Sequence, residues 1–588
     1  MYHHYMMNLL KSNLFLRKNI FFLLLILIAI LPRFIFLSNV PNAINQDELH
    51  YALDAKSFFL TGKDVLGQTS LVDVLLFNSP KSEPLQAELQ YFFEIPVLGL
   101  MGFSMTNLVL PNVLLGILTV VLIYLITLKL FDKNTALLAG LIAAINPWLI
   151  FLSRTTYEAG PATLFFLCVF YMMLITKSWK ILLTIPFALL AFYSHIATKL
   201  IFLPFMSLSI LYAFLSVNKR KYFKQYLFLF MFSCVLTLFF LFQLKQGKSS
   251  RGTEILLPNS IAIIQRVNEV RKATIQNPFI NLVENKFTVY GSFLVRNTFN
   301  IFSPTYLFAN ADYFFMLGGH GLFYYIDSFF LIIGLGWAFL KNKKLFLTFV
   351  LIIFVGIVPQ IVHSSSVNGN FSHHIALSIP FMIIFMSLGI NGVFGKFKDK
   401  KRRVLFIVLI ALIYIFSFLR FSNFYFFRYP LQAGTFGVEN RILSKYITLS
   451  EDEKRPIIIY SVNPMLAFKE FLFYSNLYNK NTVKTINESL KDKKFIYNNI
   501  SFISCSRSML PDSQPVLVID DANCDRSRSE HSISIAQLED SGKKYNIYGD
   551  KACSSFNLPG YISNLKLSDF DVENLPAKKF CETFIVSY

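Results

Sequence analysis

The stretch LPNVLLGILTVVLIYLITLKLFDKNTALLAGLIAAINPWLIFLSRTTYE, residues Leu110 to Glu158, contains two long apolar runs separated by a short basic turn. A helix needs about 20 largely apolar residues to cross a bilayer, and each run approaches that length. Similar runs recur over roughly the first 420 residues. They predict a polytopic α-helical membrane protein with about eleven or more transmembrane helices, at residues 19–37, 108–131, 135–152, 159–176, 181–195, 197–216, 226–244, 322–340, 345–362, 373–394 and 404–421.

The composition agrees with this class. Of the 588 residues, 54% are apolar and only 15% are charged, whereas soluble domains carry about 25% charged residues. The net charge of +20 would suit nucleic acid, but stacking aromatic residues interleaved with a basic face are not evident, so we expect no nucleic-acid partner. The basic residues instead cluster in short connections between the spans, at Lys11, Arg17 and Lys18; Lys129 and Lys133; Lys177 and Lys180; Lys219–Lys224; Lys341–Lys344; and Lys396–Arg403.

This clustering predicts the orientation in the membrane, because short cytoplasmic loops are enriched in Lys and Arg. The basic amino terminus runs into an apolar stretch without a small-residue cleavage site, so we interpret it as a retained first span. With a cytoplasmic amino terminus, every basic cluster falls on the cytoplasmic side. We then expect a transmembrane domain over 1–421, with extracytoplasmic loops at 38–107 and 245–321, and a soluble extracytoplasmic domain over 422–588.

The carboxy-terminal segment changes character, since its apolar runs shorten to strand length. RPIIIYSV (Arg455 to Val462) and QPVLVID (Gln514 to Asp520) are typical of buried strands, and the sequence between them has helical character, so a small α/β domain is predicted. Four of the six cysteines lie here, at Cys505, Cys524, Cys553 and Cys581. In an extracytoplasmic domain they favour two disulfides, with three possible pairings, over a metal site, because no close CxxC pair is present.

An acidic pair, Asp47 and Glu48, follows the first span within NQDELHYALDAKSFFLTGKDVLG (Asn45 to Gly67). Asp47 is a candidate general base toward an acceptor hydroxyl or amine, and Glu48 could hold an acceptor group or a cation. A divalent metal ion at this pair is possible but not required. The alternative is that the pair caps a helix running through YALDAKSFF, since carboxylates favour helix N-termini.

Other ionisable residues collect on the predicted outer side, where such groups are costly near a membrane unless they serve a site. Arg154 and Lys199 are candidate phosphate contacts, with anchoring at the headgroups as the alternative. Lys81, beside Glu83, lies in a proline-containing loop that could be a simple surface turn. His195 and Lys199 are four residues apart and share one helical face. Candidate substrate-binding residues are Glu158, His195, His373 and His374.

His373 and His374 are adjacent in FSHHIALSIP. Adjacent residues of a helix point in different directions, so we do not expect these two imidazoles to share a metal ion. No HExxH, GxxxxGK[ST] or GxSxG pattern is evident, which argues against zincin, P-loop and nucleophile-elbow chemistry.

These motifs, taken in order, resemble a known family. A first span, then DE, a Tyr–Ala helix and TGKDVLG, is similar to the C-type, multi-span glycosyltransferases that use polyprenyl-phosphate sugars. Within them the chain resembles the branch of protein O-mannosyltransferases and the lipid A aminoarabinose transferase. The supporting stretches are SPKSEPLQAELQYFFEIPVLGLMGFS, the opening stretch and SHIATKLIFLP, covering roughly residues 15–210. FNIFSPTYLFANAD and FSHHIALSIP extend the resemblance more loosely over 290–420, and the terminal domain carries no assignable motif.

The resemblance implies a polyprenyl-phosphate-linked sugar donor and an extracytoplasmic transfer that inverts the anomeric centre. It maps the base to Asp47, with Glu48 beside it, and the donor-phosphate contacts to Arg154, Lys199 and Lys81. Two positions depart from the family pattern. The first loop reads PKSEP where relatives usually have KPP. His373 and His374 occupy a position near which relatives often carry arginine.

Two other classes compete with this interpretation. A lipid or glycolipid transporter would also place charged groups near broken spans, but such proteins often show internal repeats, and none is evident in this sequence. A scaffold that presents its disulfide-bonded domain is the third class. The sequence identifies neither the sugar nor the acceptor.

Overall fold

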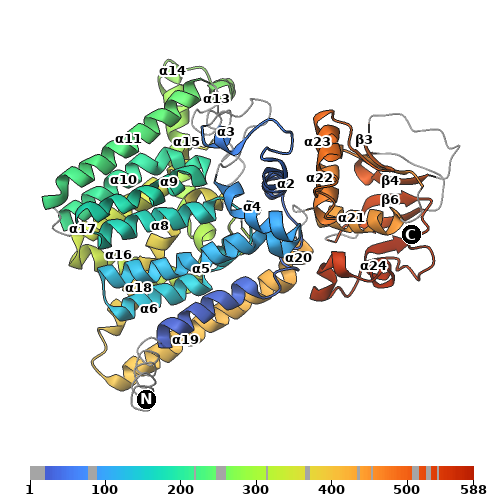
Figure 1. Ribbon diagram of the computed structural model, residues 1–588. Coiled ribbons are helices and arrows are strands. Elements are labelled where there is room, and N and C mark those ends of the chain that lie inside the picture. The colour runs from blue at the N-terminus through green and yellow to red at the C-terminus, as the bar shows by residue number, and fades with distance from the viewer. Residues whose placement is uncertain are drawn as a thin grey trace, which may run out of the picture. The chain divides into compact units, whose positions relative to one another are not determined.

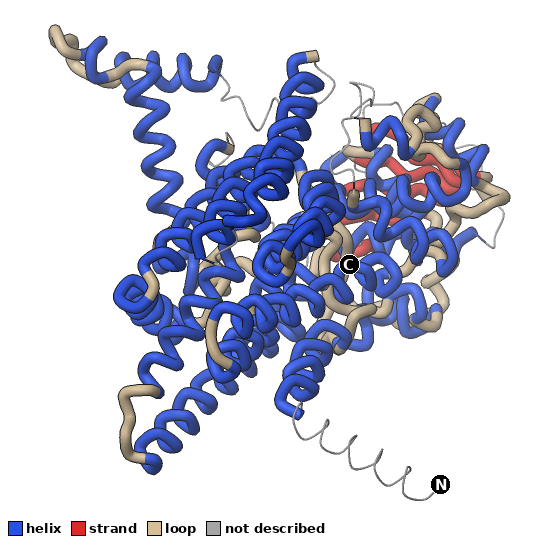
Figure 2. Tube along the Cα trace, turned by 60° about the vertical axis from the view of Figure 1, so that its left-hand side comes forward, coloured by secondary structure: helices blue, strands red, loops and turns tan. Residues whose placement is uncertain are grey.

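The protein, a computed structural model, forms two compact units (Figure 1). Unit 1 comprises Met1–Ile35, Lys81–Leu89 and Asn112–Phe421, and unit 2 comprises Phe36–Pro80, Gln90–Pro111 and Ser422–Tyr588. The structure describes residues 20–76, 89–216, 220–246, 260–312, 316–363, 371–432, 437–451, 455–505, 516–524, 532–538 and 542–587. Among these residues, the strands of the sheet all belong to unit 2 (Figure 2).

Unit 1 is a bundle of helices, and its long apolar helices agree with most of the predicted spans to within a few residues, whereas α13 to α15 lie in the predicted loop 245–321. Its helices are Ile20–Phe34, α5 (Met105–Leu130), α6 (Lys133–Ile145), α7 (Pro147–Ser153), α8 (Ala159–Ile175), α9 (Thr184–Ser194), α10 (Ile196–Ser216), α11 (Phe223–Lys245), α13 (Ser260–Lys272), α14 (Ile280–Val283), α15 (Lys286–Ile301), α16 (Tyr325–Lys341), α17 (Lys343–Val362), α18 (Ser378–Phe394) and α19 (Lys400–Asn423). This helical architecture confirms the predicted fold class.

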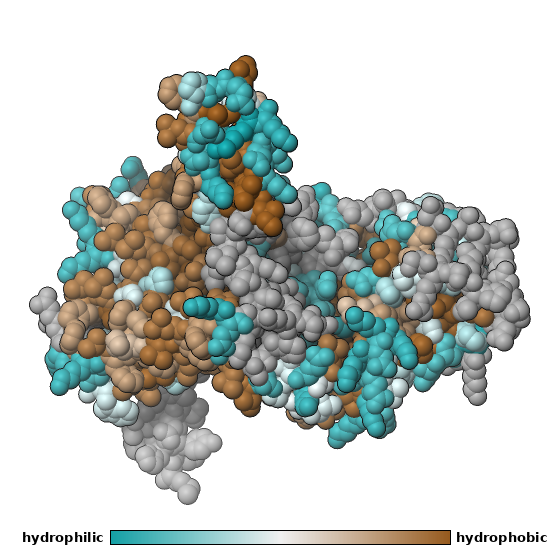
Figure 3. All heavy atoms as spheres, turned by 90° about the horizontal axis from the view of Figure 1, so that it is seen from above, coloured by the Kyte–Doolittle hydropathy of each residue, from teal (hydrophilic) through white to brown (hydrophobic). Residues whose placement is uncertain are grey.

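Five helices of the described residues are long and apolar enough to cross a membrane, or six if a bent pair counts as one span. The shorter apolar helices include Ile20–Phe34, Ala159–Ile175, Ser178–Ser194 and Ser378–Phe394, so the number of spans stays a prediction. Figure 3 shows brown, apolar side chains over broad areas of the helical unit. α11 alone exposes Leu227, Phe228, Met231, Val235 and Leu238. A surface of this kind is stable against lipid and not against water.

The predicted span over 135–152 is broken, because α6 and α7 meet at a bend of 59°. Pro147 is the first residue of α7, where its missing N–H would have no helical partner. The Asn146 side chain accepts a hydrogen bond from the backbone N–H of Leu149 at 2.9 Å and so caps α7. The same amide donates to the carbonyl of Leu322 at 3.0 Å, which fixes the bend against another segment.

The connections of unit 1 gather at two different ends of the bundle. At one end, Asn391 Nδ2 donates to Thr135 Oγ1 at 2.8 Å, and Phe131 packs on Trp337 with ring centroids 6.4 Å apart. These residues lie beside the basic connections at 129–133, 341–344 and 396–403. The polar breaks at 154–158, 195 and 372–375 meet elsewhere, as shown below. The packing thus brings some basic connections to one place and the polar breaks to another, and the side of the membrane that each faces stays a prediction.

Unit 2 joins the first predicted loop to the carboxy-terminal segment. Its helices are α2 (Gln46–Thr61), α3 (Leu71–Leu75), α4 (Gln90–Met101), α20 (Tyr429–Gln432), α21 (Val438–Ser450), α22 (Pro464–Tyr474), α23 (Val483–Lys491) and α24 (Ala577–Phe584). Its strands are β1 (Ile457–Ser461), β2 (Ile496–Tyr497), β3 (Ile500–Ser504), β4 (Leu517–Asp521), β5 (Ser532–Ala536), β6 (Lys543–Tyr548) and β7 (Ile585–Ser587).

The seven strands form one sheet in the order β2-β3-β1-β4-β6-β5-β7. β1 is parallel to both β3 and β4, whereas β6, β5 and β7 continue the sheet in antiparallel fashion. Every residue of β1 and β4 is buried, as expected for parallel strands covered on both faces. α22 and α23 lie between these strands in the chain. The predicted α/β character and both predicted buried strands are confirmed.

The first loop is tied to the carboxy-terminal segment by buried polar contacts. Arg441 Nη1 donates to the carbonyl of Asn42 at 2.7 Å, and Asn42 Nδ2 donates to the carbonyl of Pro430 at 2.6 Å. The backbone N–H of Ile44 donates to the Tyr474 hydroxyl at 3.1 Å. These bonds place the segment that precedes α2 in the same compact unit as the sheet.

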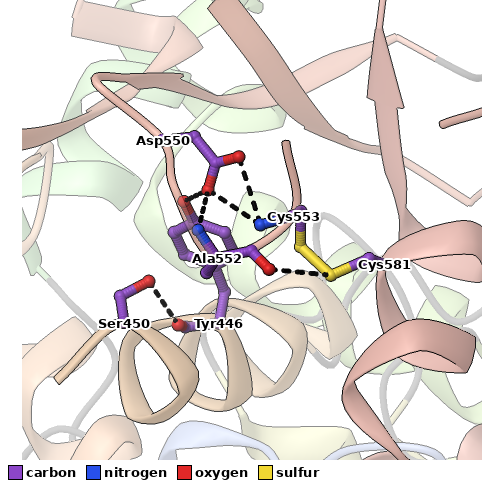
Figure 4. The surroundings of a disulfide bond; sticks show 6 residues. All are labelled: Tyr446, Ser450, Asp550, Ala552, Cys553 and Cys581. Carbon is purple, nitrogen blue, oxygen red and sulfur yellow. Dashed lines mark hydrogen bonds between the residues drawn. A yellow bond between two sulfur atoms is a disulfide. The ribbon is translucent and has the colours of Figure 1, made fainter. Parts of the chain in front are cut away.

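The four terminal cysteines form two disulfides, Cys505–Cys524 and Cys553–Cys581, which confirms the predicted disulfides and selects one of the three pairings. Asp550 organises the turn that carries Cys553 (Figure 4). Its carboxylate accepts from the backbone N–H groups of Ala552 and Cys553, and from the hydroxyl of Tyr446. The turn is therefore held by the sheet domain's own helix α21 as well as by the disulfide.

Candidate functional site

Polar residues from three helix breaks of unit 1 lie together. Glu158 is the residue at which α8 begins, and His195 interrupts the chain between α9 and α10 with extended backbone dihedrals. His373 and His374 lie on the short 3-10 turn Ser372–Ile375 between α17 and α18. Glu158 Oε1 is 3.5 Å from His195 Nε2, and the carboxylate is 13% exposed. The structure thus brings four predicted site residues to one place.

The three histidines form a compact cluster. The ring centroids of His373 and His374 are 4.0 Å apart, and those of His195 lie 5.7 Å from His373 and 6.0 Å from His374. One nitrogen of each ring lies within 4.8 Å of the others. The expectation that the adjacent histidines point apart is therefore wrong. A tight 3-10 turn, with tilted rings, lets both side chains reach His195.

The turn that carries the two histidines is held by groups from two other segments. The Ser372 backbone N–H donates to Asp312 Oδ2 at 2.8 Å, and the Ser372 hydroxyl donates to the same oxygen. The Tyr306 hydroxyl lies 3.1 Å from Ser372 Oγ. Gln360 Oε1 accepts from the backbone N–H of Phe371 at 3.1 Å. Sequence reasoning missed these supporting residues, although Tyr306 and Asp312 lie in the quoted stretch FNIFSPTYLFANAD.

A fourth histidine adjoins the cluster. The ring centroid of His363 lies 4.8 Å from that of His374. A neutral imidazole keeps a lone pair for hydrogen bonding or coordination.

A small cavity adjoins the histidines. It has a volume of about 10 Å³ and is lined by His195, His373, His374, Thr198 and Thr163, among other residues. This is about the room that one water molecule or one ion requires. The lining combines these histidines and threonines with apolar residues such as Phe166 and Leu377, and all of it lies within unit 1.

Lys199 lies one helical turn beyond His195 and is buried, with 1% exposure. Its Nζ is 5.9 Å from the ring centroid of Phe192 and 5.7 Å from that of Phe240. Aromatic faces attract a cation by their quadrupole. A lysine held in this way lies inside the protein and is not a headgroup anchor on the outside of the bundle, so that alternative is disfavoured.

Arg154 is fully buried at the end of α7. Its Nη1 donates to the carbonyls of Pro32, Arg33 and Ile35 at 3.1, 3.0 and 2.8 Å. The guanidinium therefore satisfies carbonyls at the end of the first helix, which would otherwise lack partners. This contact is structural, and a contact of Arg154 with phosphate stays a prediction.

The acidic pair lies in unit 2, in the first turn of α2. Asn45 and Glu48 form a capping box, in which Glu48 Oε2 accepts from the Asn45 backbone N–H at 3.0 Å and Asn45 Oδ1 accepts from the Glu48 N–H at 2.9 Å. The capping alternative therefore holds for Glu48, which is 3% exposed. Asp47 is half-buried beside it. Lys81 lies outside the described residues.

Unit 2 also contains a cavity that the sequence did not predict. Its volume is about 480 Å³, and its lining includes Arg441, Lys445, Tyr474, Asp571 and Glu573. The charged residues of the lining come from α21 and from the segment between β6 and β7, so no local sequence pattern could have revealed them.

Two solved structures are similar to this chain at low sequence identity. ArnT from Cupriavidus metallidurans in the apo state is 12% identical, with a TM-score of 0.46, and the match covers 90% of this chain and 98% of that one. Archaeal oligosaccharyltransferase AglB from Archaeoglobus fulgidus, in complex with an inhibitory peptide and a dolichol-phosphate, is 13% identical, with a TM-score of 0.43 and coverage of 86% and 70%. Because these identities and TM-scores are low, no residue of this chain is assigned to a residue of either structure.

The comparison by sequence is more specific. No curated protein matches the chain. Residues 89–243, however, match the family described as dolichyl-phosphate-mannose-protein mannosyltransferase. The matched segment contains Arg154, Glu158, His195 and Lys199. This similarity over residues 89–243 confirms the predicted resemblance to the multi-span glycosyltransferases that use sugars linked to a lipid phosphate.

Proposed function

We propose that this protein is an integral-membrane glycosyltransferase that transfers a sugar from a polyprenyl-phosphate donor to an extracytoplasmic lipid, protein or glycan. The observation that carries the proposal is the family match over residues 89–243, since the family's described donor is a sugar on a lipid phosphate. The apolar helices of unit 1 supply the membrane environment that such a donor needs.

Chemically, the reaction displaces a lipid phosphate from the anomeric carbon of the sugar. In our proposal Asp47 takes the proton from the acceptor hydroxyl or amine as that group attacks, which inverts the anomeric centre. The bond from the anomeric carbon to the phosphate oxygen breaks, and the phosphate leaves with the electron pair. Glu48 holds Asp47 in place through the capping box at the start of α2.

The leaving phosphate needs positive charge where its own charge develops. We assign this role first to Lys199, which is buried and held against two aromatic rings, and then to Arg154 and Lys81. We assign contacts with the substrate to the residues at the helix breaks of unit 1, namely Glu158, His195, His373 and His374.

The proposed orientation places the amino terminus in the cytoplasm and unit 2 outside it. The separation of basic connections from polar breaks supports this orientation. The two disulfides of unit 2 support it too, because disulfides persist in oxidising compartments.

The test uses the full chain in lipid nanodiscs with a polyprenyl-phosphate sugar labelled in the sugar. We expect labelled sugar to be released from the lipid, or transferred when a membrane extract supplies acceptors. In parallel, the chain in liposomes is tested for movement of intact donor between leaflets. Movement of the donor without cleavage would contradict the proposal and favour a transporter.

A further inference from the structure

Histidine is the side chain that most often ligates transition metals, and it does so as neutral imidazole. His195, His373 and His374 offer three ring nitrogens within 4.8 Å of one another. Tetrahedral zinc with bonds of about 2.0–2.1 Å places its ligand nitrogens roughly 3.3 Å apart. Small rotations of the rings would close the remaining gap, and the adjacent cavity of about 10 Å³ has room for one ion.

The hydrogen bonds around His374 determine which of its nitrogens faces the cluster. Gln360 Oε1 accepts from the Phe371 backbone N–H, so this atom is the amide oxygen, and it lies 3.1 Å from His374 Nδ1. His374 Nδ1 must therefore donate. Its Nε2 then carries the lone pair in the neutral tautomer. Buried metal sites use such outer partners to fix the tautomer of a ligand.

His195 has a comparable partner. The Glu158 carboxylate is 3.5 Å from His195 Nε2, and a carboxylate behind an imidazole is a common second partner of zinc-bound histidine. This leaves Nδ1 of His195 as the ring nitrogen for coordination. The third histidine, His373, is positioned by the turn that Asp312 holds through Ser372.

We infer that His195, His373 and His374 form a binding site for one divalent transition-metal ion of the zinc type. Three imidazoles leave a fourth position for a water or another oxygen ligand, as in zinc sites that are not purely structural. Imidazole donors select zinc, copper, nickel or iron over magnesium and calcium. The inference does not rest on the proposed transfer reaction, since metal uptake requires neither donor nor acceptor.

The test measures metal uptake by the full chain, purified without a polyhistidine tag in nanodiscs and stripped with a chelator. We expect the wild type to bind about one Zn²⁺ per chain by mass spectrometry of the metal. Co²⁺ in the same site should give the visible absorption of a four- or five-coordinate ion, and Zn²⁺ should displace it.

Three variants and one matched control locate the site. His195→Gln and His374→Gln should each weaken binding at least about 10-fold. His320→Gln should bind as the wild type does, because the His320 ring packs on Tyr324 and Phe421 instead of on the cluster. Gln360→Leu should weaken binding less than loss of a ligand does, since Gln360 only positions His374.

Wild-type protein that takes up no Zn²⁺ at micromolar free metal would overturn the inference. So would a monodisperse His374→Gln variant that keeps full occupancy and an unchanged Co²⁺ spectrum. If a variant fails to fold, pulsed electron paramagnetic resonance of Cu²⁺-loaded wild type decides the matter. Coupling to several imidazole nitrogens supports the site, and absence of that coupling contradicts it.

Discussion

Buried ionisable side chains have different partners in the two units. In unit 2, Arg441 pairs with Glu573 at 2.5 Å, Asn440 donates to Glu470 at 2.5 Å, and Glu48 closes a capping box. In unit 1, three histidines and a glutamate from separate helix breaks lie around one small cavity. Each of these groups in unit 2 has a defined bonding partner, whereas the four groups in unit 1 gather around a cavity with room for one water molecule or ion. Ionisable residues that gather inside a helical bundle, as these four do, mark functional sites in membrane proteins.

Asp47 of unit 2 gives the sharpest test of the comparison. Asp47 lies in the first turn of α2, but the capping box uses Asn45 and Glu48. If Asp47 is the general base, Asp47→Asn should lower the rate of transfer by about 10²–10⁴-fold without changing thermal stability. Glu488→Gln, an exposed carboxylate of the same unit, is the matched control. A rate within a factor of about two of wild type would remove Asp47 from the mechanism.

Lys199 tests whether unit 1 supplies the positive charge. Loss of one donor to a developing oxyanion costs about 10²–10³-fold in rate, so Lys199→Gln should reduce transfer by that order. Lys180→Gln removes an exposed lysine from a basic connection and should leave the rate unchanged. Equal rates for both variants would show that the buried lysine only packs against Phe192 and Phe240.

Arg441 tests the structural role of charge in unit 2. Its guanidinium is 1% exposed, and it binds Glu573 and the carbonyl of Asn42. Removing one member of a buried ion pair leaves the other charge, here that of Glu573, without its partner. Arg441→Ala should therefore lower the free energy of unfolding by about 3 kcal/mol. Arg266→Ala removes an exposed pair with Glu269 and should change stability little. Denaturation followed by fluorescence measures both, and equal effects would contradict the assignment.

The smallest predicted effect concerns pH. Burial raises the pKa of Glu470 to about 8, with Glu439 adding to the rise and Asn440 and Lys544 opposing it. Because the folded pKa exceeds the unfolded value, the protonated form favours folding. Its contribution is full below about pH 4.5 and is lost as the pH rises through about 8.

Glu470→Gln is neutral at every pH, so the variant should lose less stability than wild type between pH 5 and pH 8.5, and its melting temperature should fall less over that range. Parallel pH profiles of wild type and variant would contradict the raised pKa. Glu488→Gln again serves as the control, since that carboxylate is exposed.

Local patterns predicted most of the fold. Apolar runs located the helices of unit 1, and short apolar runs located β1 and β4, because both signals depend only on nearby residues. The helix break at Asn146 lies inside an apolar run and was not predicted, although Pro147 follows it directly. The disulfide pairing and the grouping of the first loop with the sheet depend on contacts between distant segments, such as Arg441 with Asn42.

The site was predictable as a set of residues and not as an arrangement. Glu158, His195, His373 and His374 were selected because they interrupt apolar sequence. Their clustering follows from the packing of α8, α10 and α18, which periodicity does not reveal. The sequence suggested an α-helix at His373 and His374, but the 3-10 turn that begins at Ser372 directs both side chains toward His195. Glu48, proposed as a site residue, belongs to the capping box of α2.

The most direct test of the account asks which compartment each region faces. Single cysteines at Gln46, His363 and Lys398, with Cys168 and Cys234 replaced by serine, can be probed in sealed right-side-out vesicles with a membrane-impermeant maleimide. We predict labelling at positions 46 and 363 in intact vesicles, and at position 398 only after permeabilisation. Labelling of positions 46 and 363 from opposite sides would contradict the proposed extracytoplasmic location of both Asp47 and the histidine end of unit 1.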